Sequence, residues 1–165
     1  MGRCTALFSL ACRISCGGHV HTVDPFDCSG DEFSIPHYLE GLESSGFENL
    51  RGAFDHYVAT YGEKDFCIVH VGTVGSVMSG WEEVVDVLLL DGDQSPEGAR
   101  EAFDCCVPFL RVGGTLILRN TKDRQYAPGH DGHRRLVLEE LTKPCFSSVR
   151  QVGATTIATK SMELT

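Results

Sequence analysis

Short apolar runs alternate along the chain with segments in which apolar residues recur every three or four positions. The clearest run opens the stretch "VDVLLLDGDQSPEGAR", residues 85–100. Its uninterrupted Val-Leu-Leu-Leu predicts a strand buried on both faces, as in a parallel sheet, because a half-buried strand would alternate apolar and polar residues. Ser95 suits the N-cap of a following helix, and Pro96 suits its first turn, where an N–H is not needed. The acidic turn then lies at the carboxyl end of the strand, where open α/β sheets bind their ligands.

The same alternation predicts the order of elements in the rest of the chain. Helices are expected at the N-terminus, over residues 35–61 with a break at 44–46, after Pro96, and over 133–141 with Asp131 as its cap. Two closing strands around Gly153 are expected to form an antiparallel hairpin. These elements indicate one α/β domain, residues 1–165, with a mostly parallel sheet and antiparallel pairing at one edge. The expected strands lie near residues 19–24, 66–71, 85–90, 115–119, 146–152 and 155–160.

Size and charge narrow the classes of protein that fit. The chain has 165 residues, of which 42% are hydrophobic, so it can form one domain with a substantial core. Its net charge of −9 disfavours a nucleic-acid partner, because such binding relies on neutralising phosphates. No apolar run approaches the roughly 18 residues that span a membrane. Near the N-terminus, Leu7, Leu10, Ala11 and Ile14 recur at helical spacing and Arg13 interrupts the run, which favours an amphipathic helix over a secretory signal.

The eight cysteines form no C-x-x-C pair. Most of them fall in predicted helices or strands, where a free cysteine packs as a small hydrophobic residue. Reduced thiols in a cytoplasmic protein are therefore expected, in preference to a disulfide framework or a zinc site.

Three segments carry a resemblance to a known family: "VHTVDPF" (residues 20–26), "VDVLLLDGDQSPEGAREAFDCCVPFLRVGGTLILRN" (85–120) and the closing hairpin. The central segment resembles the small O-methyltransferase-like family of class I S-adenosylmethionine-dependent methyltransferases. Members of that family carry a D-G-D-H-S-Y-E-G-V turn before a helix and a P-x-L-x-x-G-G strand. The resemblance extends over residues 2–160. It implies a Rossmann-like sheet with helices on both faces, S-adenosylmethionine as the cofactor, and methyl transfer to a small-molecule acceptor at oxygen.

The resemblance also implies which residues hold the cofactor. Asp24 ends its strand at the ligand edge, where its carboxylate could accept hydrogen bonds from both ribose hydroxyls; an ordinary solvated aspartate at a strand end is the alternative. Thr73 stands beside the expected adenine site, where the family usually has an acid. Asp91 matches the acid that faces the methyl end of the cofactor. The implied cofactor-binding residues are Asp24, Gly72, Thr73, Val74, Asp91 and Gly92.

In metal-dependent relatives the acid at Asp91 binds a divalent cation. Hard cations need several oxygen ligands, and Asp91, Asp93 and Asn120 could provide them. However, the strand end that is often acidic in the family is Asn120 here, and the histidine of the D-G-D-H turn is Gln94. These departures favour a hydrogen-bonded acidic turn without metal over a divalent-cation site.

The family begins with a strand that ends in an acid and a glycine-rich loop, followed by a helix whose start resembles residues 2–5. This chain begins at that helix, so the resemblance implies an N-terminally truncated domain. Residues 20–23 and 87–90 would flank the absent strand, and their backbone groups need partners. We expect these two strands to pair directly, a second chain to insert a segment, or water to fill the gap. A homodimer with weak cofactor affinity is the most economical outcome.

Methyl transfer to a hydroxyl is helped by a base beside the acceptor. His130 and His133 lie in a polar segment beyond the expected strand at 115–119 and are the candidate catalytic residues. Solvated loop histidines are the alternative interpretation.

Two other classes of function compete with an enzyme of this family. A catalytically degenerate methyltransferase-like domain would bind a ligand or partner without turnover, and the departures at Thr73, Gln94 and Asn120 favour it. A metal hydrolase is suggested by His19-x-His21, but a barrel built on that strand needs about 250 residues, more than this chain has.

Overall fold

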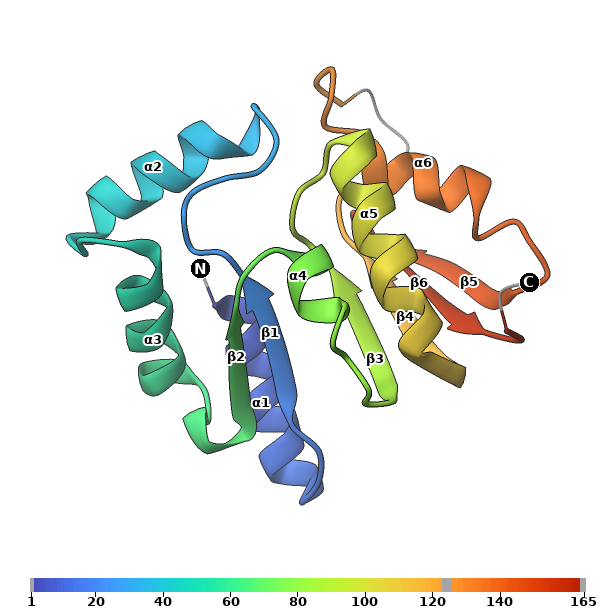
Figure 1. Cartoon of the computed structure of the whole chain (residues 1–165), viewed down its shortest axis with the longest axis horizontal. Helices are drawn as coiled ribbons and strands as arrows, with labels where there is room; N and C mark the ends of the chain where they lie inside the picture. The colour runs from blue at the N-terminus through green and yellow to red at the C-terminus, as the bar shows by residue number, and fades with distance from the viewer. Residues whose placement is uncertain (1, 123–125, 164–165) are drawn as a thin grey trace. The chain divides into compact units, whose positions relative to one another are not determined.

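The computed structural model describes residues 2–122 and 126–163. The chain divides into two compact units (Figure 1). The first comprises Met1–Ser29 and Ile35–Thr73, and the second comprises Gly30–Ser34 and Val74–Thr165. The alternation of strands and helices predicted a single sheet. This prediction is wrong, because each unit has its own sheet.

The first unit is built on two parallel strands and the helices around them. The predicted break in the helical region is confirmed, because α2 ends at Ser45 and the Asn49 side chain caps α3 by accepting a 2.8 Å hydrogen bond from the Gly52 N–H. In the strand pair, Asp24 is aligned with Val71. The elements are α1 (Arg3–Ser15), β1 (Val20–Asp24), α2 (Ser34–Ser45), α3 (Leu50–Tyr61), a 3₁₀ turn (Lys64–Phe66) and β2 (Cys67–Val71).

Helix α1 forms as predicted, but its apolar stripe is not its buried face. Leu7 and Ile14 are 68% and 77% exposed, whereas Thr5, Ala6 and Ser9 are buried. Small residues allow close approach: a Cβ on Gly62, just after α3, would lie 2.8 Å from the Ala6 Cα. Hydroxyls add specific contacts, since the Ser9 Oγ accepts a hydrogen bond from the Glu63 N–H and the Thr5 Oγ1 is 3.0 Å from the Thr22 Oγ1.

The second unit has a four-stranded sheet in the order β3-β4-β6-β5. β3 and β4 are parallel, and the two ladders that β6 makes are antiparallel. The closing hairpin turns at Gly153, whose φ of 61° lies in the left-handed region that suits glycine. The predicted α/β fold with a C-terminal antiparallel hairpin is therefore confirmed. The elements are α4 (Val74–Met78), β3 (Val85–Leu90), α5 (Pro96–Cys106), a 3₁₀ turn (Val107–Phe109), β4 (Leu110–Leu118), α6 (Gly132–Glu139), β5 (Phe146–Val152) and β6 (Thr155–Lys160).

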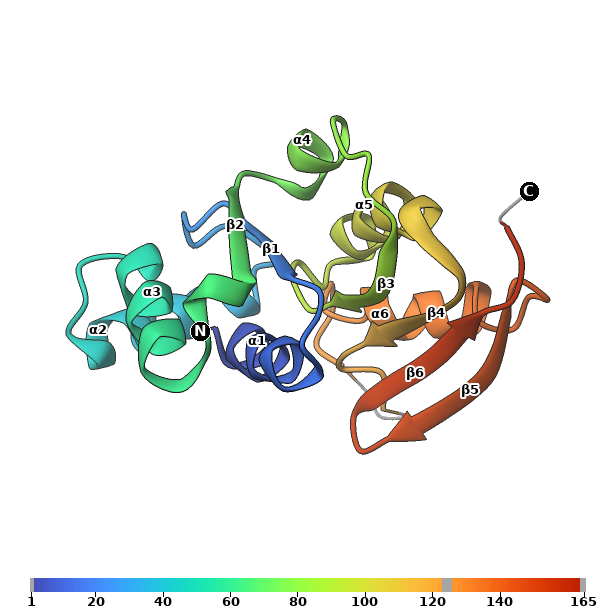
Figure 2. The same cartoon turned by 90° about the horizontal axis from the view of Figure 1, so that it is seen from below.

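The core of the second unit lies between this sheet and two helices. α5 and α6 contact each other and pack over one face of the sheet (Figure 2). Phe103 of α5, Leu136 of α6, and Leu116 and Leu118 of β4 are all 2% exposed or less. Each such side chain contributes about 1.5–3 kcal/mol when it leaves water, so this cluster holds the carboxyl ends of β3 and β4 in place.

The apolar run of β3 predicted a strand buried on both faces. This prediction is wrong. Val87 is 49% exposed, and β3 is an edge strand that pairs with β4. Direct pairing between β1 and β3 is likewise absent from the described ranges, since β1 pairs with β2 in the other unit. An edge strand has a neighbouring strand on one side only, so its side chains are less covered than those of a central strand.

Two further expectations concern caps and cysteines. Asp131 occupies the N-cap position of α6, but its side chain does not cap the helix, because Oδ2 accepts a 2.9 Å hydrogen bond from Arg135 instead. All eight cysteines are free thiols. None of the helices in the described part of the chain is long and apolar enough to cross a membrane.

Candidate functional site

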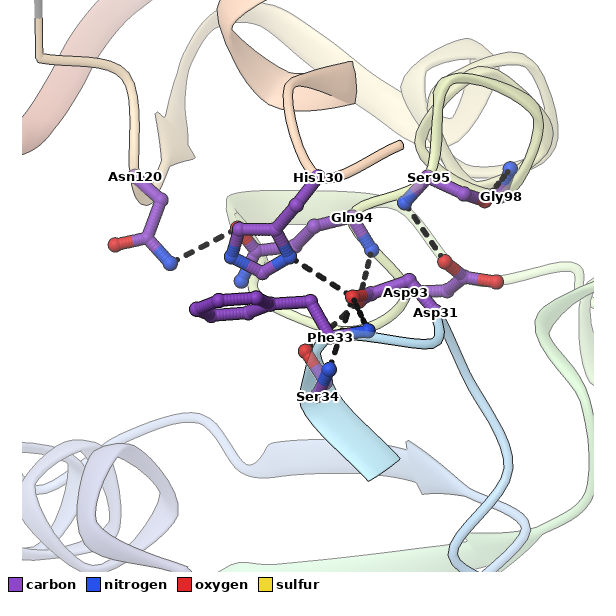
Figure 3. Close-up of polar contacts among 9 residues, drawn as sticks. All are labelled: Asp31, Phe33, Ser34, Asp93, Gln94, Ser95, Gly98, Asn120 and His130. Carbon is purple, nitrogen blue, oxygen red and sulfur yellow. Dashed lines mark hydrogen bonds and ion pairs between the residues drawn. The ribbon is translucent and has the colours of Figure 1, made fainter. Parts of the chain in front are cut away.

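The turn between β3 and α5 is held by its own side chains (Figure 3). The Asp93 carboxylate accepts a 2.8 Å hydrogen bond from the Ser95 N–H, and the Ser95 Oγ accepts one of 3.0 Å from the Gly98 N–H. Ser95 is therefore the N-cap, with Pro96 in the first turn, as predicted. A Cβ at residue 98 would overlap the Asp93 side chain, so glycine is needed there. The result is a rigid acidic turn at the carboxyl end of β3.

A buried carboxylate, that of Asp31, lies beside this turn and gathers hydrogen-bond donors from three parts of the second unit. Its Oδ1 accepts from the backbone N–H groups of Phe33 and Ser34 and lies 2.9 Å from Nδ1 of His130. Its Oδ2 accepts from the Ser34 hydroxyl and the Gln94 N–H (Figure 3). Burial raises the pKa of Asp31, but the hydrogen bonds outweigh it and leave the pKa below its ordinary value. Asp31 is therefore ionised at neutral pH.

This carboxylate orients the His130 side chain. Because an ionised carboxylate only accepts, Nδ1 of His130 is the donor in their contact. The ring centroid lies 4.5 Å from that of Phe33 and 6.4 Å from that of Tyr126, and the side chain is 8% exposed. Within the described ranges, Nε2 of His130 has no hydrogen-bond partner. The geometry is that of an imidazole base held by a carboxylate.

The second candidate base, His133, lies in a different environment. It is 1% exposed, and its Nδ1 lies 3.0 Å from the backbone carbonyl oxygen of Arg119, to which it donates. Burial lowers the pKa of His133 to about 4. The imidazole is therefore neutral at pH 7, and its main contact ties the start of α6 to the end of β4.

The end of β4 adds two side-chain contacts to the turn. Nη1 of Arg119 donates to the Asp91 carboxylate at 2.8 Å, and Nδ2 of Asn120 donates to Oε1 of Gln94 at 2.9 Å. Asn120 adopts a left-handed conformation with φ of 53°, which asparagine tolerates better than most residues. Burial raises the pKa of Asp91, and the Arg119 guanidinium opposes that rise.

These contacts bear on the expected divalent-cation site. Asp91 is paired with Arg119, the Asp93 side chain holds the turn, and Asn120 directs its amide nitrogen to Gln94. In the ranges 2–122 and 126–163, no group of three or more His, Cys, Asp or Glu residues could hold a metal ion. The three candidate ligands do not fit a divalent cation, because each is engaged with a different partner.

Three further cofactor candidates, Asp24, Gly72 and Thr73, lie in the first unit, at the carboxyl ends of β1 and β2. The Asp24 carboxylate accepts a 2.7 Å hydrogen bond from the Phe26 N–H, and burial raises its pKa. The Gly72 N–H donates to the Asp24 carbonyl at 3.2 Å, and Thr73 follows directly. The structure therefore brings together the residues expected at the ribose and at the adenine.

The predicted cofactor residues thus form two groups. Asp24, Gly72 and Thr73 belong to the first unit; Val74, Asp91 and Gly92 belong to the second, as do both candidate bases.

Two residues of this region, Asp31 and Arg119, were not predicted from the sequence. Asp31 lies three positions before Ser34 at the start of α2, a spacing typical of a helix N-cap, so its place was predictable although its contact with His130 was not. Arg119 directly follows β4, and its pairing with Asp91 follows from the parallel register of β3 and β4.

Comparison with known proteins shows which family and which folds the chain is similar to. A protein-family model described as a methyltransferase domain matches residues 1–121. A protein from Klebsiella pneumoniae provisionally assigned as an O-methyltransferase is similar in structure, with a TM-score of 0.54 and 11% identity over 98% of this chain and 81% of its own. A Staphylococcus aureus protein provisionally assigned as a caffeoyl-CoA O-methyltransferase has a TM-score of 0.54 and 14% identity over 91% of this chain and 68% of its own.

A structural-genomics target from Corynebacterium glutamicum gives a TM-score of 0.51 and 15% identity over 88% of this chain. The present chain spans 62% of that protein, which is less than two thirds of its length. At these identities the structural likenesses show a shared fold. The family match covers most of the chain, and the resemblance seen in the sequence is confirmed: the chain belongs to the methyltransferase-domain family.

Proposed function

We propose that this protein uses S-adenosylmethionine to methylate a hydroxyl oxygen of a small molecule, with His130 as the base. The observation that carries the proposal is the contact between His130 and the buried Asp31. Membership of the methyltransferase-domain family supports the reaction class. The fold shared with proteins provisionally assigned as O-methyltransferases supports oxygen as the methylated atom.

The chemistry of the first unit fits the nucleoside part of this cofactor. The Asp24 carboxylate ends β1 next to Gly72, and among the described residues its Oδ2 accepts no hydrogen bond. A carboxylate oxygen in that position can accept hydrogen bonds from ribose hydroxyls. By the family resemblance, Gly72 and Thr73 of the same unit would hold the adenine. When bound, S-adenosylmethionine supplies a methyl group already activated by the positive sulfur.

The protein's own contribution is to position the acceptor and to take its proton. The acceptor hydroxyl would donate to Nε2 of His130, because Nδ1 is occupied by Asp31. As the oxygen gains the methyl group, its proton moves to Nε2, and the Asp31 carboxylate stabilises the imidazolium that forms. The proton then leaves to water. General-base assistance of this kind is worth about 10²–10⁴ in rate.

Cofactor binding is tested by isothermal titration calorimetry with S-adenosylmethionine on Asp24→Ala. Loss of a charge-assisted hydrogen bond should weaken binding by about 1.5–3 kcal/mol. Asp27→Ala is the matched control, since Asp27 lies on the same loop and its carboxylate accepts a hydrogen bond from the Ser29 N–H. Unchanged affinity in Asp24→Ala would mean that Asp24 is only a strand-end residue.

Catalysis is tested by following S-adenosylhomocysteine formation with a panel of simple phenols and alcohols. His130→Gln should lower kcat about 100-fold or more while leaving the affinity for S-adenosylmethionine unchanged. His133→Asn is the comparison, because Nδ1 of His133 donates to a neutral backbone carbonyl, that of Arg119, and no carboxylate in the described part of the chain orients its ring. A His130→Gln enzyme with wild-type kcat would remove the base from the proposal.

A second candidate is a degenerate domain that binds a ligand without turnover. The hydrogen bond between Asn120 and Gln94 favours it, because these side chains replace an acid and a histidine of the related family and satisfy each other. Heat on titration with S-adenosylmethionine, without turnover of any acceptor, would support this candidate over the enzyme.

A further inference from the structure

We propose that the Arg119 guanidinium takes the place that a divalent cation occupies beside the acid at Asp91 in metal-dependent relatives, so that this site works without metal. The side chains expected to bind a cation make other contacts in the structure. This role of Arg119 concerns the charge beside Asp91 and does not require that the protein be an active enzyme.

The backbone places the two residues side by side. β3 and β4 run parallel, and Leu90 is aligned with Leu118, so Asp91 and Arg119 occupy the next position of the same register. The Arg119 N–H donates to the Leu90 carbonyl at 3.4 Å and extends the ladder by one step. Strand register therefore places Asp91 and Arg119 next to each other, and their side-chain rotamers complete the ion pair.

The charge of Asp91 is compensated by this contact. The Asp91 Oδ2 accepts from Nη1 of Arg119 at 2.8 Å, and the two side chains are 31% and 46% exposed. A guanidinium stays protonated at every physiological pH, so the positive charge beside Asp91 is permanent. A divalent cation at the same carboxylate would have to displace Arg119 and would meet its repulsion.

The other two candidate ligands are held by separate contacts. The Asp93 Oδ1 accepts from the Ser95 N–H, and Nδ2 of Asn120 donates to Oε1 of Gln94. A hard cation requires several oxygens that converge on one point, and Asp91, Asp93 and Asn120 each have a separate partner.

The presence of Arg119 in place of a cation also affects which acceptors can be methylated. This consequence rests on the proposed function. A metal ion can bind two adjacent hydroxyls of one acceptor at once, whereas a guanidinium already paired with Asp91 can only donate hydrogen bonds. Acceptors with a single hydroxyl should therefore be used as well as those with two adjacent hydroxyls.

The proposal is tested by Mn²⁺ uptake, measured from the electron paramagnetic resonance signal of the free ion in millimolar Mn²⁺. The wild-type chain should take up none at Asp91. Arg119→Asp places a second acid beside Asp91 and should create uptake that is measurable in millimolar Mn²⁺. The double variant Asp91→Asn with Arg119→Asp should lose it again.

Arg111→Asp is the matched control. Arg111 pairs with Asp86 on the same two strands, β4 and β3, away from their carboxyl ends. The same substitution at that ion pair should leave Mn²⁺ uptake at the wild-type level. Uptake in Arg111→Asp equal to that in Arg119→Asp would show only a general effect of added acid and would overturn the proposal.

Mn²⁺ uptake by the wild-type protein tests the proposal even if Arg119→Asp does not fold. Mn²⁺ uptake by the wild type that Asp91→Asn abolishes would overturn the proposal, and its absence supports it. Where turnover is found, it should continue unchanged in a chelator, and a requirement for Mg²⁺ or Mn²⁺ would also overturn it. A protein without turnover would contradict the proposed enzyme and leave the Mn²⁺ results valid.

Discussion

Asp31 and His130 lie 99 residues apart in the chain, and the Asp31 Oδ1 is 2.9 Å from Nδ1 of His130. The carboxylate is 2% exposed and also caps the start of α2 through Ser34. One side chain therefore joins the loop before α2, the turn after β3 and the loop before α6. The contact orients a base and stabilises the region that presents it.

Replacing Asp31 with Asn should destabilise the protein by about 3 kcal/mol at pH 7, because a buried, multiply hydrogen-bonded charge is lost. The pKa of Asp31 is lowered in the folded protein, so its contribution is complete above its ordinary pKa near 4. The contribution is lost as the pH falls through the lower folded value. Urea unfolding of wild type and Asp31→Asn at pH 7 and pH 3 should show a smaller difference at pH 3. A difference independent of pH would contradict the ionised state.

His133 should make the protein less stable in mild acid. Its pKa is lowered to about 4 by burial, so the folded protein keeps it neutral while the unfolded chain binds a proton near pH 6.5. Stability is then full above pH 6.5 and falls by roughly 3 kcal/mol as the pH drops toward 4. His133→Asn, which can still donate to the Arg119 carbonyl, should show a flatter profile in thermal unfolding between pH 7.5 and 4.5. If wild type and His133→Asn lose stability in parallel as the pH falls, the loss comes from titrating groups other than His133.

Lys160 should be important for stability despite its charge. It is fully buried, and its Nζ donates to the carbonyls of Val107 and Leu110 and to the Glu163 carboxylate. Lys160→Met should cost about 2–3 kcal/mol, because two buried carbonyls lose their donor. The control is Lys143→Met: the Lys143 side chain is half-exposed, and its buried partner Glu140 keeps the hydrogen bond from Arg100, so the change should stay within about 1 kcal/mol. Equal midpoints of denaturant unfolding for the two variants would refute this role.

Gly132 should tolerate no side chain. Its N–H donates to the Gln94 carbonyl at 2.9 Å, and a Cβ there would overlap the Ser95 carbonyl oxygen and the Ala99 side chain. Gly132→Ala should cost about 3 kcal/mol, since the backbone at the starts of α5 and α6 must separate. Gly41→Ala, on an open face of α2, should instead stabilise by about 0.5–1 kcal/mol. Differential scanning calorimetry of both variants checks the opposite signs.

The sequence alone was sufficient for the strand–turn–helix unit at residues 85–100, the cap at Ser95, the break before α3 and the hairpin at Gly153. Each of these depends on apolar periodicity or capping chemistry within a few neighbouring residues, which is why it can be predicted locally. Family membership followed from the same turn and the glycines behind it.

Tertiary structure alone decided which of these local features meet. α1 buries its small residues rather than Leu7 and Ile14, because close approach to the backbone at Gly62 requires small side chains. β3 lies at a sheet edge although its sequence is as apolar as a central strand. The contacts of His130 with Asp31 and of Asp91 with Arg119 depend on how distant segments pack and on strand register, and no local pattern of apolar and polar residues contains that information.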